Sequence, residues 1–296
     1  MNHLSKGTQL IASLNDEERI KRILSEKWIG YTRARETLKK LEDLLIHPKT
    51  HRMPNMLLVA PTNNGKTILL FKFFDTHKPI ITEATTHLCI PVVYIQAPPK
   101  PDEKMFYINI LQALNVPHRV TDKSLRLYQQ AMHVLRKVEA KILIIDEIHH
   151  ILAGPYIQQR VFLNVIKCLA NDLQIVIVGA GIKDALSAIN TDKQLANRFE
   201  PAILPRWKMD EEYMRLLTSF EALLPLKNAS NLVHESIALK ILSMSEGTIG
   251  EISTILKKAS VYAIRNKKEC IDLQTLAKIE YVPPSNRQRQ YESDLI

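Results

Sequence analysis

The sequence predicts an α/β protein in which a parallel sheet flanked by helices is followed by an all-helical region. Short apolar runs alternate with longer amphipathic segments up to about residue 204, a pattern typical of parallel sheets. From Asp210 onward the periodicity is wholly helical. We therefore expect a five-stranded parallel sheet with helices on its flanks and a small C-terminal all-helical domain.

Each expected element has a local signal. Asn15 is followed by three acidic residues and an apolar stripe, which indicates a capped helix. A second amphipathic helix ends before Pro48. Short apolar runs predict buried strands at 56–60, 91–96, 141–145, 174–178 and 202–204. Helical periodicity predicts further helices at 65–74, 103–114, 123–138, 156–170, 210–223, 230–243, 249–265 and 272–279.

The chain is expected to have four parts. Residues 1–27 form an N-terminal helical extension, 28–207 the α/β domain and 208–281 the helical domain. The tail, 282–296, is polar and contains proline, so we expect it to be disordered.

Composition narrows the class of protein. The net charge of +9 suits a polyanionic partner such as nucleic acid, although a merely basic surface explains it equally well. The three cysteines have no paired spacing, so we expect small buried residues and no disulfides. No apolar run approaches the ~20 residues of a membrane span, and the N-terminus has no signal-peptide pattern. We expect a cytoplasmic protein with no membrane partner.

The first chemical motif is Asn64-Gly65-Lys66-Thr67, which follows the strand predicted at 56–60. The backbone N–H groups of such a turn can bind phosphates, Lys66 can reach the β- and γ-phosphates, and the Thr67 hydroxyl can hold Mg²⁺. Ala60 stands where the motif G-x-x-x-x-G-K-[ST] has its first glycine, and a negative φ accommodates its methyl group. The alternative is a helix N-terminus that binds no ligand.

The second motif is Asp146-Glu147, at the end of the strand predicted at 141–145. Asp146 suits the shell of a bound metal ion, and Glu147 suits the polarisation of an attacking water. Together the two motifs predict a site for a nucleoside triphosphate and Mg²⁺, in which Lys66 and Glu147 are catalytic and Thr67 and Asp146 hold the metal.

Several blocks between residue 28 and about residue 265 resemble the AAA+ ATPases and, within them, the TniB/TnsC family of transposition regulators. They are Trp28-Ile29-Gly30-Tyr31, Arg52-Met53-Pro54-Asn55, Pro61-Thr62-Asn63-Asn64-Gly65-Lys66-Thr67, Ile144-Ile145-Asp146-Glu147-Ile148-His149, Asn197-Arg198-Phe199-Glu200 and Glu246-Gly247-Thr248-Ile249-Gly250-Glu251.

The resemblance implies an AAA+ P-loop NTPase with a helical lid that assembles with ATP on double-stranded DNA, as a ring or a helical filament. It also implies a nucleoid-associated bacterial protein that links a TniQ-like target selector to a DDE transposase of the TniA/TnsB type.

The resemblance extends the nucleotide site beyond the two motifs. It implies that the 29–31 segment approaches the adenine and that the lid approaches it through two residues. The alternative is that Trp28 and Tyr31 are core aromatics, which fits Trp28 at least as well. The expected nucleotide contacts are Ile29, Gly30, Tyr31, Thr62, Asn63, Asn64, Gly65, Lys66, Thr67, Ile68, Ile249 and Gly250.

Three residues bear on hydrolysis. Arg198 lies where AAA+ proteins carry an arginine finger that stabilises the γ-phosphate of a neighbouring subunit, although a surface salt bridge is the alternative. Ala180, after the fourth strand, replaces an expected polar sensor, and Glu251 replaces a lid arginine. Alanine cannot donate a hydrogen bond. We therefore expect an ATPase whose slow turnover is stimulated by DNA or partners.

The two helices between the strands at 91–96 and 141–145 form an insertion that resembles the DNA-binding segment of initiator-type AAA+ proteins. Its basic character and lack of base-reading side chains predict salt-sensitive, non-specific duplex binding, with a solvated charged face as the alternative. The expected DNA contacts are Lys100, Lys104, Arg119, Thr121 and Lys123.

Two other functions stay open at this point. A helicase loader of the AAA+ class shares the fold and the finger, and a nucleotide-stabilised DNA scaffold with negligible hydrolysis fits Ala180 and Glu251. His149 and His150 follow the carboxylates, but no third ligand at useful spacing indicates a zinc site.

Overall fold

The structure is a computed structural model that describes residues 2–82 and 87–287. The chain divides into two compact units. The sheet unit comprises Arg33–Pro61 and Lys66–Leu204, and the helical unit comprises Met1–Thr32, Thr62–Gly65 and Pro205–Ile296. The N-terminal residues therefore join the C-terminal helices, and four residues of the predicted phosphate loop join them too.

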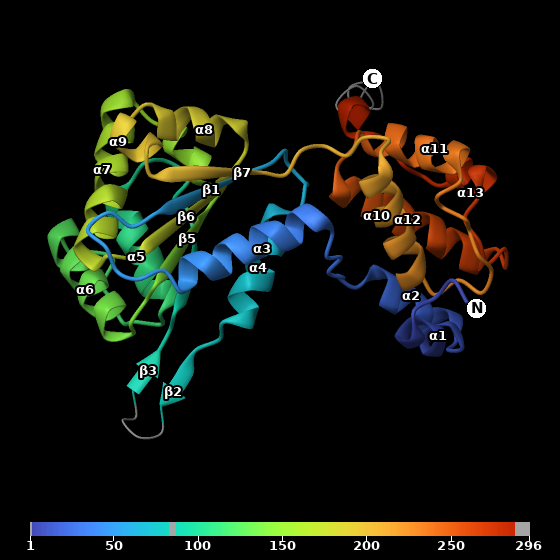
Figure 1. Cartoon of the computed structure of the whole chain (residues 1–296), viewed down its shortest axis with the longest axis horizontal. Helices are drawn as coiled ribbons and strands as arrows, with labels where there is room; N and C mark the ends of the chain where they lie inside the picture. The colour runs from blue at the N-terminus through green and yellow to red at the C-terminus, as the bar shows by residue number, and fades with distance from the viewer. Residues whose placement is uncertain (1, 83–86, 288–296) are drawn as a thin grey trace. The chain divides into compact units, whose positions relative to one another are not determined.

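The sheet unit contains the predicted five-stranded parallel sheet, which is confirmed (Figure 1). Its strand order is β4-β5-β6-β1-β7, so the first strand of the chain lies near the middle of the sheet. Every residue of the central strands β1, β5 and β6 is buried, as their continuous apolar runs predict. The strands are β1 (Asn55–Val59), β4 (Val92–Gln96), β5 (Ile142–Asp146), β6 (Val176–Gly181) and β7 (Phe199–Ile203).

Two strands differ from their predicted ranges by more than one residue because β1 sets their register. Val59 pairs with Gly181 on one side, so β6 extends to Gly181. Asn55 pairs with Phe199 on the other side, so β7 begins at Phe199. Ala180 consequently lies inside β6, opposite Leu58, and not after the strand as the sequence predicts.

Helices cover the sheet, and a small hairpin lies apart from it. Alternate strand residues such as Leu57 and Leu143 pack into one large core with α5, α6 and α7. On α4, Phe71 and Phe74 contact Tyr94 of β4. The helices are α3 (Thr32–Leu45), α4 (Lys66–Thr76), α5 (Glu103–Ala113), α6 (Ser124–Lys137), η1 (Ile148–Ala153), α7 (Tyr156–Leu173), α8 (Lys183–Asn190) and α9 (Lys193–Ala196). The unpredicted antiparallel hairpin is β2 (Ile80–Thr82) and β3 (His87–Cys89).

The helical unit has its own apolar core, to which Ile23 of α2 contributes. Arg19 of α2 is fully buried and bonds to Asp16, to Glu269 and to the carbonyl of Pro225, which ties α2 to the C-terminal half of the chain. The helices are α1 (Lys6–Ala12), α2 (Asp16–Leu24), α10 (Glu211–Leu223), α11 (Glu235–Ser245), α12 (Ile249–Arg265) and α13 (Leu273–Lys278).

Two further expectations need correction. The tail is predicted to be disordered from residue 282, but residues 284–287 are helical and Arg287 bonds to Glu251. Residues 288–296 lie outside the described part of the chain. The cysteines are free, as expected, but Cys168 is exposed and the other two are half-buried, because helix α7 presents Cys168 away from the sheet-facing stripe.

Candidate functional site

The two sequence motifs meet within the sheet unit. Thr67 lies in the first turn of α4, and Asp146 is the last residue of β5. The Thr67 hydroxyl donates a hydrogen bond of 2.8 Å to the Asp146 carboxylate. The carboxyl ends of parallel strands meet at one edge of a sheet, which is where ligands of open α/β sheets bind. The two predicted metal ligands are therefore adjacent although 79 residues separate them.

Asp146 is buried and accepts two more hydrogen bonds. The Tyr94 hydroxyl donates to it at 2.8 Å, and so does the backbone N–H of Glu147. Burial, reinforced by the bond to Asp146, raises the pKa of Tyr94, so its proton stays in the bond. Tyr94 is not among the predicted site residues; its signal in the sequence is one polar-tipped aromatic within the otherwise apolar run at 92–95.

Lys66 opens α4 as a buried cation. Its ammonium group donates to the carbonyls of Ala60 and Pro61 at 3.2 Å each. Burial lowers the pKa of Lys66, and the nearby charges of Glu147 and Asp146 oppose that effect. The lysine thus lies folded against its own loop, with acceptors that phosphate oxygens could replace.

Glu147 has a strained backbone and a histidine neighbour. Its φ of +54° is in the left-handed region, which only a small fraction of non-glycine residues adopt. His149 Nε2 lies 3.3 Å from the Glu147 carboxylate. Burial lowers the pKa of His149, and the charge of Glu147 opposes the shift. The neutral imidazole can therefore hold Glu147 by a hydrogen bond.

The structure corrects the expectation that the two histidines have no third potential ligand. Glu147, His149 and His150 offer ligand atoms that all lie within 4.8 Å of one another. In the described residues, the Nδ1 atoms of both histidines are buried without a hydrogen-bond partner. The spacing rule missed this group because the turn at Glu147 folds the three residues together.

Residues Thr62–Gly65 of the phosphate loop belong to the helical unit, where they contact the start of α12. The N–H of Gly250 donates to the Asn63 carbonyl at 3.0 Å, and the N–H of Ile249 donates to the Asn64 side chain at 3.2 Å. These N–H groups begin a helix and so lack partners within it. A Cβ at residue 250 would come within 1.9 Å of Asn63 Oδ1, so a larger residue there would displace the Asn63 side chain.

The expected adenine-side segment is half-buried in the helical unit. The Tyr31 ring packs edge-on against Trp207, with ring centroids 5.0 Å apart. Ile29, Tyr31 and Trp207 all pack against the apolar core of this unit. Tyr31 therefore has the packing contacts of the core-aromatic interpretation. Thr62 and Ile68 are exposed.

Among the described residues, Arg198 and Ala180 make no side-chain hydrogen bond or ion pair with the motif residues Lys66, Thr67, Asp146 and Glu147. The Arg198 guanidinium, at the start of β7, donates to the Asn171 side chain at 2.6 Å. The contact is with an amide, and the described residues offer Arg198 no carboxylate partner, so the alternative of a surface salt bridge loses support. Ala180 is fully buried in β6 and supplies no donor from its side chain.

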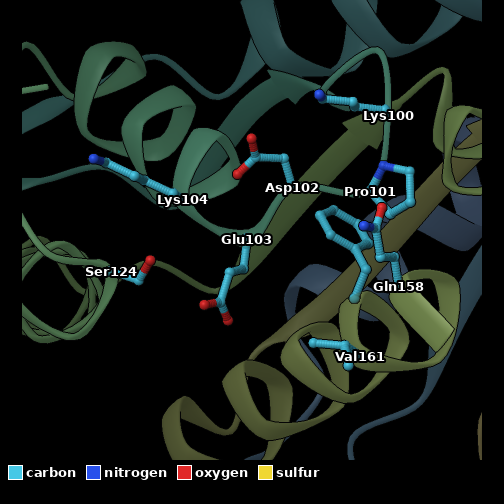
Figure 2. Close-up of a pocket in the computed structure, with 9 residues that line it drawn as sticks. Lys100, Pro101, Asp102, Glu103, Lys104, Ser124, Gln158 and Val161 are labelled. Atoms are coloured by element: carbon cyan, nitrogen blue, oxygen red, sulfur yellow. The ribbon is translucent and has the colours of Figure 1, made fainter. Parts of the chain in front are cut away.

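The predicted DNA-contacting residues lie around the starts of α5 and α6, and one hollow connects the two helices. It is lined by Lys100, Lys104 and Ser124, with Asp102 and Glu103 among them (Figure 2). The two carboxylates make the hollow itself unsuitable for a phosphate, because like charges repel. The lysines lie on either side of the carboxylates in Figure 2. Arg119, Thr121 and Lys123 are exposed on the loop between the helices.

Solved structures of other proteins share the fold. The Aeropyrum pernix ORC2 protein, in ADPNP–ADP complexes, matches with a TM-score of 0.59 and 16% identity over 92% of this chain and 74% of that one. The A. pernix ORC1 protein in complex with DNA matches with 0.57 and 14% over 93% and 71%. The Thermotoga maritima RuvB branch migration motor matches with 0.52 and 16% over 87% and 72%. The chain has the fold of the AAA+ P-loop ATPases.

The family follows from the sequence itself. The model of the bacterial TniB protein family matches residues 19–209, so the chain belongs to that family, as the resemblance implies. A comparison with curated proteins finds no match. Among the described helices, none has the length and apolar character needed to span a membrane.

Proposed function

We propose that this protein binds ATP with Mg²⁺ and hydrolyses it slowly as part of transposition. The observation that carries the proposal is the 2.8 Å hydrogen bond from Thr67 to Asp146, which brings the two predicted motifs together. A hydroxyl and a carboxylate are oxygen ligands of the kind that Mg²⁺ prefers. When bound, the metal ion would neutralise charge on the phosphates.

The contacts of Lys66 and Glu147 support the roles proposed for them. Lys66 exchanges the carbonyls of Ala60 and Pro61 for phosphate oxygens, because charged acceptors bond an ammonium more strongly. Glu147 orients the attacking water and accepts its proton, and His149 holds the carboxylate in place. Ile29, Gly30, Tyr31, Ile249 and Gly250 supply contacts to the base.

The biological role rests on family membership. As a TniB family protein, the chain assembles with itself on double-stranded DNA, as a ring or filament, and connects a TniQ-like target selector to a DDE transposase. Arg198 serves the γ-phosphate bound by the next subunit, which makes assembly depend on ATP. Its amide partner, Asn171, is a weak competitor for a guanidinium compared with a phosphate.

DNA contact comes from the insertion. Lys100, Lys104, Arg119 and Lys123 supply cations and Thr121 a hydroxyl, a set that suits the phosphate backbone and does not read bases. The carboxylates of Asp102 and Glu103 limit that contact to the rim of the hollow. Binding should therefore be non-specific and weaken as salt rises.

A scaffold with negligible hydrolysis is the second candidate, and two observations favour it. Ala180 is buried without a donor, and Glu251 is paired with Arg287, so neither supplies a polar group to the γ-phosphate. Nucleotide would then stabilise the assembly without turnover.

ATP hydrolysis with and without duplex DNA separates the two candidates. We expect slow turnover that duplex DNA stimulates, and a loss of about 10²-fold or more in Glu147→Gln. Nucleotide binding by Glu147→Gln should be retained, because Lys66 and Thr67 are unchanged. Equal rates in the wild type and Glu147→Gln would favour the scaffold, and stimulation by single-stranded DNA alone would favour a helicase loader.

A further inference from the structure

Glu251 of α12 is a buried carboxylate whose side chain is 6% exposed and which accepts hydrogen bonds from three separate segments. Asn63 Nδ2 donates to Oε1 at 3.0 Å. The Tyr281 hydroxyl donates to Oε2 at 2.7 Å, and the Arg287 guanidinium donates to the same oxygen at 2.6 Å. All four residues belong to the helical unit. The carboxylate thus connects the phosphate loop to the C-terminal segment of the chain.

The carboxylate is ionised at neutral pH because its partners outweigh its burial. Burial by itself raises the pKa of Glu251, but hydrogen bonds from Arg287, Tyr281 and Asn63 together bring it below the ordinary value of 4.5. A buried charge is costly unless it is paired. Arg287 supplies the pairing charge, so the stability of this arrangement depends on a residue 36 positions away.

Asn63 is held in an unfavourable backbone conformation by the same helix. Its φ of +57° is in the left-handed region, which asparagine tolerates better than most residues but does not prefer. Its carbonyl accepts from the N–H of Gly250, and its side-chain amide donates to Glu251. Both ends of Asn63 are therefore fixed by α12, two positions before Gly65.

We propose that Tyr281 and Arg287 are positioning residues for the phosphate loop. They hold Glu251 against Asn63, which presets the loop conformation, and Arg287 neutralises a carboxylate that would otherwise face a polyphosphate. This inference rests on the proposed function, because it assumes that the loop binds a nucleoside triphosphate.

Removal of Arg287 should weaken nucleotide binding for two reasons. Without Arg287, the ionised Glu251 stays beside the loop with only neutral donors, and its charge repels the phosphates. The loop also loses part of its preorganisation, which raises the cost of binding. Both effects weaken nucleotide binding. Removing the charge of Glu251 as well should reverse the first effect, because glutamine keeps an oxygen that can accept from Asn63.

The test is the dissociation constant of a fluorescent ATP analogue with Mg²⁺, measured on the full chain. We expect Arg287→Ala to weaken binding about tenfold, Arg287→Lys to weaken it less, and the double variant Glu251→Gln/Arg287→Ala to recover most of the loss. Arg215→Ala is the matched control, because it removes an exposed guanidinium from a salt bridge with Glu211 in the same unit. It should bind as the wild type does.

Two results would overturn the inference: wild-type affinity in Arg287→Ala, or a double variant as weak as Arg287→Ala. If Arg287→Ala does not fold, Arg287→Lys and the double variant decide by the same comparison. A wild type that binds no nucleotide would refute the proposed function.

Hydrogen exchange tests the positioning role in the absence of ligand. We expect the amides of Ile249 and Gly250 to exchange faster in Arg287→Ala than in Arg215→Ala. Equal exchange would contradict it.

Discussion

The sheet unit and the helical unit are stabilised in different ways. In the sheet unit, the central strands are buried along their whole length and pack through apolar side chains. The helical unit also has an apolar core, but there ion pairs with one buried partner join segments far apart in the sequence, Arg19 with Glu269 and Arg287 with Glu251. The first kind of stabilisation follows from local periodicity. The second depends on individual residues, so single substitutions should separate the units.

The largest expected loss of stability is that of the helical unit in Arg19→Met. The side chain of Arg19 is fully buried, and its loss leaves Glu269 and the Pro225 carbonyl without their donor. Breaking a buried pair from one side costs about 3–5 kcal/mol. Trp28 and Trp207 both lie in the helical unit, so tryptophan fluorescence during urea unfolding reports on that unit.

Arg215→Met is the matched control for this prediction, because Arg215 is exposed and pairs with Glu211 on the surface of α10. Its fluorescence transition should coincide with that of the wild type. If Arg19→Met also left the transition unchanged, the contrast between the units would be wrong.

A smaller effect should separate the units by pH. Burial lowers the pKa of His149 in the folded state. As pH falls below 6.5, the unfolded chain takes up the proton before the folded chain does, so the sheet unit loses stability. Glu251 and Glu269 have lowered pKa values, because hydrogen bonds outweigh burial in both. Their contribution is complete above pH 4.5 and is lost only as pH falls through their folded values.

Urea unfolding between pH 7.5 and 4 tests this order. The free energy of unfolding measured by circular dichroism, which reports on both units, should fall from about pH 6.5 downward. The value measured by tryptophan fluorescence should fall only below about pH 4.5. His149→Asn should remove the first loss and keep the second. Simultaneous losses in both signals would contradict the assignment.

The smallest expected effect is that of Tyr94→Phe. The substitution removes the hydroxyl that donates to Asp146 and keeps the ring contacts with Phe71 and Phe74. A lost hydrogen bond to a charged acceptor costs about 1.5–3 kcal/mol at most, and Thr67 still donates to the same oxygen. We expect the free energy of unfolding measured by circular dichroism to fall by about 1 kcal/mol, and the transition followed by tryptophan fluorescence to stay unchanged. Tyr107→Phe, in a different part of the same unit, is a control for removing a hydroxyl.

The sequence predicts most of the sheet unit because its signals are local. Buried strands read as apolar runs, and Thr67 and Asp146 stand at strand or helix ends, where parallel topology brings them together. The ends of strands β6 and β7 were not predicted correctly. They are set by pairing with β1, and no local sequence pattern contains that pairing. The hairpin of β2 and β3 was missed because three-residue strands give no periodic signal.

The contacts around Glu251 could not be predicted for a different reason. In the sequence, Glu251 is a departure from a family pattern, and Arg287 is one basic residue in a polar tail expected to be disordered. Composition indicates disorder because it counts apolar burial and ignores single ion pairs. The pairing of a carboxylate with donors from residues 63, 281 and 287 exists only in the folded chain.

By itself, the sequence determined the class of fold, and it predicted the phosphate loop and the residues suited to ATP and Mg²⁺, because short-range patterns and motifs carry that information. Only the tertiary structure decided that Tyr94 and His149 hold the two carboxylates, and that Asn63 is fastened to α12. It also assigned the N-terminal helices and residues 62–65 to the helical unit. These features depend on which distant groups become neighbours when apolar surfaces are buried, and a linear pattern does not contain that information.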